Sequence, residues 1–336
     1  MLLSRPILQV AMLATLIVLA LIFDFLNGLN DSASIVATVI SSRALNPRPA
    51  LLLTALGEFI GPFLFGVAVA KTLAADLLDP GAITLEVLVA ALIGAIAWGL
   101  VTWYLGVPSS SSHALVGGLL GAAISAVGAG VVIQAGLLKI LAALFLSPVL
   151  GLAASFLFTK LIFLVAGRAT RRINQSFRRI QVLTAFTLAL THGSNDGQKT
   201  MGMIVLGLLA AGRLDSFQVP LWVVVAAATG IALGTSVGGW RMMRTLGGRI
   251  IKVRPVHGFA SQLAGAVVVL GAGLLGGPVS TTQVLSSGIM GAGAAERVNM
   301  VRWQVGQEML TAWLLTIPTT GLVASLSYFV LTAFLS

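Results

Sequence analysis

Long, nearly uncharged apolar segments recur along this sequence and limit the folds open to it. Examples lie at residues 50–70, 85–107, 219–240 and 311–334, and each can cross the roughly 30 Å hydrocarbon core of a membrane. Charged residues make up only 9% of the chain, whereas a soluble domain carries about a quarter. The alternating pattern of a membrane β-barrel is absent, so helices must satisfy the backbone in lipid. The sequence therefore predicts an all-α polytopic membrane protein.

The first apolar segment, residues 6–26, is predicted to be a retained membrane span. No small-residue cleavage site with a polar mature domain follows it, as would be typical of a removable signal peptide. Segments 6–42, 85–127 and 180–211 are each long enough for one broken helix or a re-entrant pair. We therefore expect about ten to twelve helical spans.

Charge and rare residue types exclude several other classes of protein. The net charge of +10 comes mostly from Lys and Arg in short loops between apolar segments, which is a topology signal and not a nucleic-acid surface. The chain has no cysteine, which excludes disulfides, iron–sulfur clusters and thiolate metal sites. Its three histidines fit no metalloprotease spacing, and no phosphate-binding or nucleophile-elbow motif occurs. We expect neither an enzyme nor a bound cofactor.

Three motifs recur in the same order in the two halves of the chain, a pattern typical of transporters. The motif Asn-Gly-Leu-Asn-Asp-Ser begins at residue 27 and its counterpart His-Gly-Ser-Asn-Asp-Gly at residue 192, an offset of 165 positions. A glycine-rich segment and a segment of proline and hydroxyl residues follow in both halves. The paired segments are 27–32 with 192–197, 57–72 with 230–245, and 106–113 with 277–283.

The charges of corresponding loops predict that the two halves have inverted topology. Loop 43–48 is basic and its counterpart 213–215 is neutral, whereas loop 71–79 is slightly acidic and its counterpart 241–254 is strongly basic. Short cytoplasmic loops carry the excess of Lys and Arg, so corresponding loops lie on opposite sides of the membrane. The predicted organisation is one transport domain made of membrane repeat 1–167, a short basic cytoplasmic connector 168–179 and membrane repeat 180–336.

Polar motifs inside the apolar segments predict broken or re-entrant helices. Asn and Gly are unfavourable inside helices, and both occur at 27–31 and at 192–196. Pro108 and Pro278 are each followed by hydroxyl residues, which are favoured helix N-caps. We therefore expect four helix N-termini to point at one central cavity. Free N–H groups and hydroxyls at such termini suit a tetrahedral oxyanion.

The acids in these motifs indicate a cation beside the anion. Asp31 and Asp196 repel an anion unless a cation lies near them, and their oxygens suit Na⁺ or proton exchange. Glu58 is a further candidate, although Ile231 stands at the corresponding position of the second half. The predicted ligands of the coupling cation are Asp31, Asp196, Asn30, Asn195 and Glu58. The predicted substrate contacts are Asn30, Asp31, Ser110, Ser111, Ser112, Asn195, Asp196, Ser280, Thr281 and Thr282.

Residues near these motifs are accessory candidates whose roles stay open. Lys199 either attracts the anion or neutralises Asp196. Asn30 and Asn195 either bind ligand or cap a broken helix, and the hydroxyl residues bond either the substrate or the preceding helical turn. The accessory candidates are Asn27, Ser34, His113, Lys199 and Gln283.

Six segments carry a resemblance to a known family, above all the Asn-Asp signature present in both halves. These segments are 23–28, 30–31, 37–45, 192–199, 277–282 and 313–318. In them the chain resembles the inorganic phosphate transporter (PiT) family. The resemblance implies phosphate as substrate, Na⁺ or H⁺ as the driving ion, and a site built from the Asn-Asp and hydroxyl-rich motifs. Ser34 and Gln283 depart from the family, which commonly has Asn and His at these places.

We therefore predict secondary active import of phosphate by alternating access, with the anion bound at the midplane of the membrane. The alternatives are a symporter of sulfate or another oxyanion and, in another class, a passive anion channel, although a buried acid pair is unfavourable in an anion channel. A metal–phosphate complex as substrate and a homodimer are also open. The expected location is a prokaryotic inner membrane, surrounded by lipid and without a nucleic-acid partner.

Overall fold

The structure, a computed structural model, describes residues 5–166 and 173–335. Those residues are almost entirely helical and hold no β-strand, which confirms the predicted all-α fold. Five of the helices are long and apolar enough to cross a membrane, or six spans if the bent pair 221–237 and 240–249 counts as one. The α-helices are α1 (Arg5–Ser41), α2 (Pro47–Ile60), α3 (Ala68–Ala75), α4 (Leu85–Leu105), α5 (Ser111–Val127), α6 (Gln134–Ala166), α7 (Ile173–Ala210), α8 (Leu221–Val237), α9 (Trp240–Arg244), α10 (Pro255–Leu274), α11 (Thr281–Glu296) and α12 (Trp303–Leu335).

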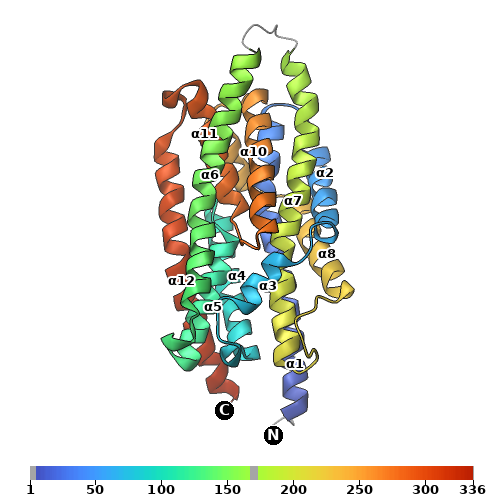
Figure 1. Ribbon diagram of the computed structural model, residues 1–336, viewed down its shortest axis with the longest axis vertical. Coiled ribbons are helices and arrows are strands. Elements are labelled where there is room, and N and C mark those ends of the chain that lie inside the picture. Colours follow the sequence, from blue (N-terminus) through green and yellow to red (C-terminus); the bar gives the residue numbers. More distant parts are fainter. Residues whose placement is uncertain (1–4, 167–172, 336) are drawn as a thin grey trace.

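Four long helices, α1, α6, α7 and α12, run along the molecule (Figure 1). Helices α1 and α6 start at the end where both chain termini lie, whereas α7 and α12 start at the opposite end. Corresponding helices of the two halves therefore point in opposite directions, as inverted repeats require.

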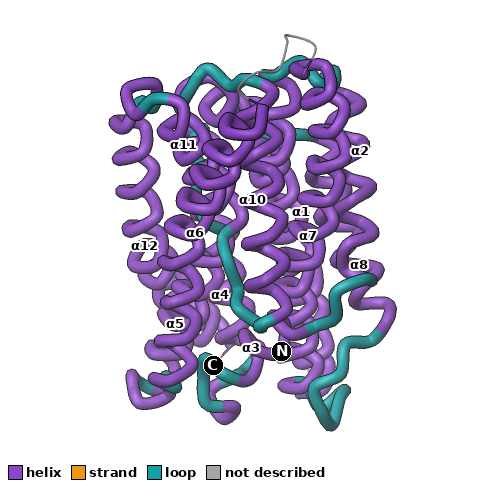
Figure 2. The backbone as a smooth tube through the Cα atoms, turned by 45° about the horizontal axis from the view of Figure 1, so that its top comes forward, coloured by secondary structure: helices purple, strands orange, loops and turns teal. Residues whose placement is uncertain are grey.

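Two helical hairpins fill the space between the long helices. The α4–α5 hairpin enters from the end with the chain termini and the α10–α11 hairpin from the other end (Figures 1 and 2). Their turns, residues 106–110 and 275–280, approach each other in the interior, where Ser112 Oγ donates a hydrogen bond to the Val279 carbonyl at 2.8 Å. Helix α5 packs against α12, and α11 packs against α6, so each hairpin is held by a helix of the other half.

Glycines make the same close helix contacts in both halves. A Cβ at Gly61, directly after α2, would lie 2.1 Å from the Leu190 carbonyl oxygen of α7, and one at Gly234 of α8 would lie 1.9 Å from the Phe25 carbonyl oxygen of α1. Residues 25 and 190 differ by the same 165 positions as the first pair of motifs. Because only glycine permits such an approach, the repeat seen in the sequence is also a repeat of packing.

The predicted breaks at 27–31 and 192–196 are wrong, because α1 and α7 run without interruption for 37 and 38 residues. The glycines there serve packing instead. A Cβ at Gly28 would lie 2.1 Å from the Ile231 carbonyl oxygen, and one at Gly193 would lie 2.4 Å from the Glu58 carbonyl oxygen. Close contact with a neighbouring helix thus outweighs their low helix propensity. Two of the four predicted interior helix N-termini remain, at α5 and α11.

The basic segments gather at the end of the molecule opposite the chain termini. Gly247, in the segment 241–254, lies against Ser41 at the end of α1. Helix α6 ends and helix α7 begins at the same end (Figure 1). Helix α7 begins at Ile173, so the second part of the predicted connector is helical and not a loop. Its first part, 168–172, lies outside the described residues.

Candidate functional site

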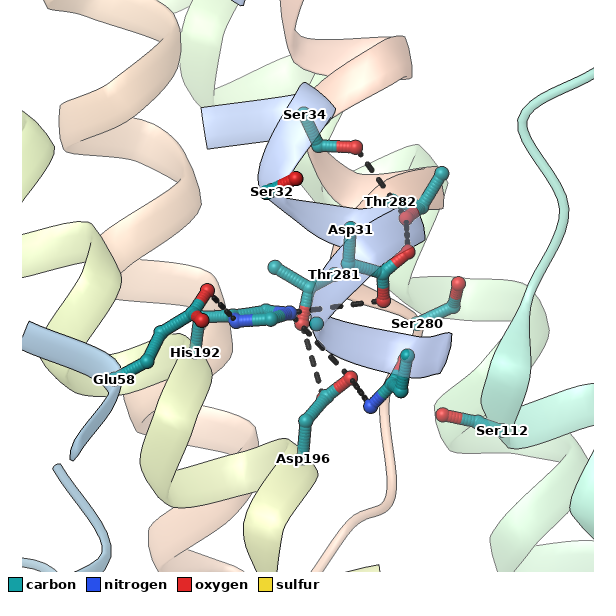
Figure 3. Close-up of polar contacts among 12 residues, drawn as sticks. Asp31, Ser32, Ser34, Glu58, Ser112, His192, Asp196, Ser280, Thr281 and Thr282 are labelled. Atoms are coloured by element: carbon teal, nitrogen blue, oxygen red, sulfur yellow. Dashed lines mark hydrogen bonds and ion pairs between the residues drawn. The ribbon is translucent and has the colours of Figure 1, made fainter. Parts of the chain in front are cut away.

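The two acids of the repeated motif lie together in the protein interior, on either side of a histidine. His192 Nε2 is 3.6 Å from Asp31 Oδ2 and 3.4 Å from Asp196 Oδ2, and its Nδ1 is 2.7 Å from Glu58 Oε1 (Figure 3). All four side chains are buried. A cluster of three carboxylates and one imidazole inside a membrane protein is costly unless it is paired, which makes it the leading candidate for the functional centre.

Three helices bring this cluster together. His192 and Asp196 are four residues apart on α7 and therefore share one face of that helix. Asp31 comes from α1, and Glu58 comes from α2, whose backbone lies against Gly193. Thr235 of α8 donates a hydrogen bond to Glu58. The sequence singled out Glu58 without a counterpart in the second half, and the structure places it beside the two aspartates.

The hydroxyl motifs begin helices that start inside the protein. Ser110 caps α5 by accepting a hydrogen bond from the His113 amide at 3.1 Å, and Ser280 caps α11 by accepting one from the Gln283 amide at 3.4 Å. The predicted N-caps are therefore confirmed. Ser280 lies in the same interior region as the acids (Figure 3), and Ser110 lines a cavity together with Asp31.

Hydroxyls of α11 reach the acids directly. Thr282 donates a hydrogen bond to Asp31, and Thr281 donates one to Asp196 Oδ1 at 3.4 Å. Ser34 of α1 donates to Thr282 at 3.3 Å, which extends this chain of polar contacts. In this conformation the two hydroxyls therefore donate hydrogen bonds to the acids of the site. The sequence had predicted that they bond either the substrate or the preceding helical turn.

Asp196 has two further partners. Lys199 Nζ donates to Asp196 Oδ1 at 2.7 Å, and Asn27 Nδ2 donates to Asp196 Oδ2 at 2.9 Å. Both side chains are buried. Asn27 comes from α1 and Lys199 from α7, so one acid joins the two halves of the protein. The accessory candidates Asn27 and Lys199 therefore lie at the acid pair.

The other predicted residues surround this centre. Asn30 Nδ2 donates to the Gly99 carbonyl at 3.4 Å, whereas the Oδ1 of Asn30 and both side-chain polar atoms of Asn195 find no hydrogen-bond partner among the described residues. His113 Nδ1 lies 2.7 Å from Ser110 Oγ and 3.5 Å from Gln283 Nε2. A buried polar atom without a partner costs about 1–3 kcal/mol, so Asn30 and Asn195 are suited to receive a ligand.

Two small cavities lie beside the centre. The larger, of about 20 Å³, is lined by Asn30, Asp31 and Ser111, and the smaller, of about 10 Å³, is lined by Ser194, Asn195 and other residues. A cavity of this size has room for about one water molecule. Neither is large enough for a phosphate ion, so the described conformation is closed around the site.

His192 was not among the site residues predicted from the sequence, although its position offered a signal. His192 precedes Asp196 by one helical turn, which places both on the same helix face. Ligand atoms of Asp31, His192 and Asp196 lie within 4.8 Å of one another, a spacing at which one cation can contact all three side chains. Thr235 was also missed, and no local pattern distinguishes it from other hydroxyls in helices.

Comparison with known proteins shows similarity along nearly the whole chain. The model of the phosphate transporter family matches residues 27–170 and 164–324. The chain is 44% identical over 324 residues to a probable low-affinity inorganic phosphate transporter of Bacillus subtilis, covering 94% of this chain and 96% of that protein. It is 44% identical over 320 residues to the protein of the same description from Rhizobium meliloti, covering 95% and 96%.

A solved structure has the same fold. It is described as the sodium-dependent phosphate transporter, with a TM-score of 0.88 and 26% sequence identity. The alignment covers 96% of this chain and 99% of that chain.

Proposed function

The chain belongs to the phosphate transporter family, and from that membership and its buried polar centre we propose that it imports inorganic phosphate by symport with Na⁺ or H⁺. Family membership and the apolar helices confirm the prediction of a multi-pass integral membrane protein that is not an enzyme. The bacterial relatives agree with a prokaryotic membrane. The observation that carries the proposal is that two interior helix N-termini lie beside a buried pair of acids.

The anion is proposed to bind at the starts of α5 and α11. The first N–H groups of a helix have no partner within it and carry partial positive charge, which suits a tetrahedral oxyanion. Ser111 and Thr281 directly follow the capping serines, so their hydroxyls can add hydrogen bonds to the same ion. Ser111 also lines the larger cavity with Asn30 and Asp31. These residues are the proposed first contacts of phosphate.

The coupling cation is proposed to bind at the acid pair and to neutralise charge there. Carboxylate and hydroxyl oxygens are hard ligands suited to Na⁺. Asp31 and Thr282 supply both types within one hydrogen-bonded pair. The description of the similar solved structure as sodium-dependent supports Na⁺. A proton held by the same cluster is the alternative, and an imposed pH gradient distinguishes the two.

Transport is proposed to proceed by alternating access. The cavities at the centre are too small for phosphate, so helices must separate on one side before the ion can enter. Asp31 and Asp196 come from different halves, and hydroxyls of α11 contact both acids. Rocking of one half against the other would therefore open this centre to one side of the membrane at a time.

The buried acids count against the two alternative functions. Phosphate keeps a proton at neutral pH that a carboxylate oxygen accepts, whereas sulfate has none, and a site built for such a bond rejects an analogue that lacks it. Asp31 lines the larger cavity and is placed to act as this acceptor. A passive anion channel would line its path with neutral or basic groups. A metal–phosphate substrate and a homodimer stay predictions.

Removal of one proposed anion contact, in Ser111→Ala or Thr281→Ala, is expected to raise the KM for phosphate about ten-fold. A hydrogen bond to a charged group contributes about 1.5 kcal/mol, which corresponds to about that factor. Initial rates of labelled phosphate uptake into proteoliposomes measure the KM. The matched control is Thr229→Ala, because the Thr229 hydroxyl is exposed and donates to the Val225 carbonyl of its own helix at 2.7 Å. An unchanged KM in both site variants would contradict the proposed anion site.

A further inference from the structure

Lys199 is a buried lysine inside α7 whose contacts differ from those expected of an anion-binding residue. Its side chain is fully buried, and its Nζ is 2.7 Å from Asp196 Oδ1. It lines neither of the two cavities beside the centre. A charged amine in a membrane interior is costly and is retained where it is paired. The ammonium group therefore pairs with Asp196 and reaches neither cavity.

The first half of the chain has no such cation at the equivalent place. The offset that relates Asp31 to Asp196 relates Ser34 to Lys199. Ser34 donates a hydrogen bond to Thr282, and Thr282 donates one to Asp31. Asp31 thus has only hydroxyl donors on this side, whereas Asp196 accepts from the Lys199 ammonium group as well as from the Thr281 hydroxyl.

The hydroxyl that symmetry would place on Asp196 points elsewhere. Ser112 and Thr282 occupy equivalent positions, each four residues after the proline of its motif. Thr282 bonds the acid of the other half, whereas Ser112 Oγ donates to the Val279 carbonyl at 2.8 Å. Asp196 instead accepts a hydrogen bond from the Thr281 hydroxyl of its own half, and the Lys199 ammonium group donates to the same oxygen, Oδ1.

The two cavities beside the centre differ in the same way between the two acids. The larger cavity reaches Asp31, whereas the smaller cavity in the second half is lined by Asn195 and Gln198 but not by Asp196. A small cation can therefore lie against Asp31 in this cavity, whereas Asp196 already has Lys199, Asn27 and Thr281 as hydrogen-bond donors. The two acids of the repeat are not equivalent binding sites.

We propose that Lys199 is a tethered cation that takes the place of one mobile coupling ion, so that only the Asp31 side of the acid pair binds a cation that is transported. The inference rests on the proposed symport function and adds to it a statement about the number of cations carried with each phosphate. An ammonium group fixed to the helix supplies one positive charge in every step of the cycle. Each phosphate is therefore carried with one cation fewer than in a site with two free acids.

The test is the number of cations carried per phosphate, obtained from reversal potentials of phosphate flux in proteoliposomes under an imposed Na⁺ or pH gradient. Lys199→Asn is expected to carry one additional cation per phosphate, because Asp196 then needs a mobile partner. Lys199→Arg keeps the fixed charge and is expected to match the wild type. Lys160→Asn is the matched control, because Lys160 is exposed on α6 with its Nζ 5.6 Å from the Phe156 ring.

The same cation number in Lys199→Asn and in the wild type would overturn the tethered-cation proposal while leaving symport intact. If Lys199→Asn is not recovered folded, the double variant Asp196→Asn/Lys199→Met removes both charges and tests the same point. It is expected to carry the wild-type number of cations, and one cation fewer would overturn the proposal. A wild-type protein that carries no phosphate under either gradient would instead overturn the proposed function, and the inference with it.

Discussion

Asp31→Asn is expected to lower cation-driven phosphate uptake by about 100-fold or more while the protein stays folded. The amide keeps the size of the side chain and can still accept the hydrogen bond from Thr282. It removes the negative charge that the mobile cation neutralises. Loss of a group that only supports a metal ligand costs about 10–100-fold in affinity, so loss of a charged ligand should reach the upper end of that range or exceed it.

The measurement for Asp31→Asn is gradient-driven uptake of labelled phosphate at matched amounts of reconstituted protein. The control is Asp76→Asn, which makes the same chemical change at a half-exposed acid paired with Lys139 at 3.2 Å. The control is expected to keep wild-type uptake. Wild-type uptake by Asp31→Asn would remove this residue from the proposed cation site.

Asp196→Asn is expected to destabilise the fold, unlike the change at Asp31. It leaves the Lys199 ammonium buried without a charged partner, and breaking a buried ion pair in this way costs about 3–5 kcal/mol. The double variant Asp196→Asn/Lys199→Met removes both charges and is expected to recover most of that loss. The free energy of unfolding of each variant is measured by denaturant titration in mixed micelles and compared with that of the wild type.

The control for these stability measurements is an exposed ion pair. Glu308→Gln breaks the contact between Arg249 Nη2 and Glu308 Oε2 at 3.4 Å, in which both side chains are about half exposed. Such pairs contribute less than about 1 kcal/mol, so little change is expected. Equal stability of Asp196→Asn and the wild type would show that Lys199 does not depend on Asp196 for its charge compensation.

Local chemistry made the hydroxyl motifs predictable from the sequence. Pro108 and Pro278 cannot continue a helix from the preceding turn, and the serines two residues later are favoured caps. The structure has α5 and α11 starting directly after these serines. The repeated motifs were predictable for a similar reason, because the same glycine spacing produces the same close helix contact in each half.

Other features depended on contacts between distant segments. Helix propensity predicted breaks at Gly28 and Gly193, but the close approach of Ile231 and Glu58 backbone atoms holds both helices continuous. The importance of His192 arises from Asp31 and Glu58, which belong to other helices. The choice between the two roles of Lys199 required its distance to Asp196 and the positions of the cavities.

In the proposed mechanism, phosphate moves together with a cation through the acid-lined centre. The most direct measurement is uptake of labelled phosphate into proteoliposomes under an imposed Na⁺ gradient or pH gradient, with excess unlabelled sulfate as competitor. We expect phosphate to accumulate above equilibrium under one of the two gradients and uptake to resist sulfate. Phosphate that only equilibrates, at a rate that neither gradient changes, would contradict symport and would favour a passive pathway.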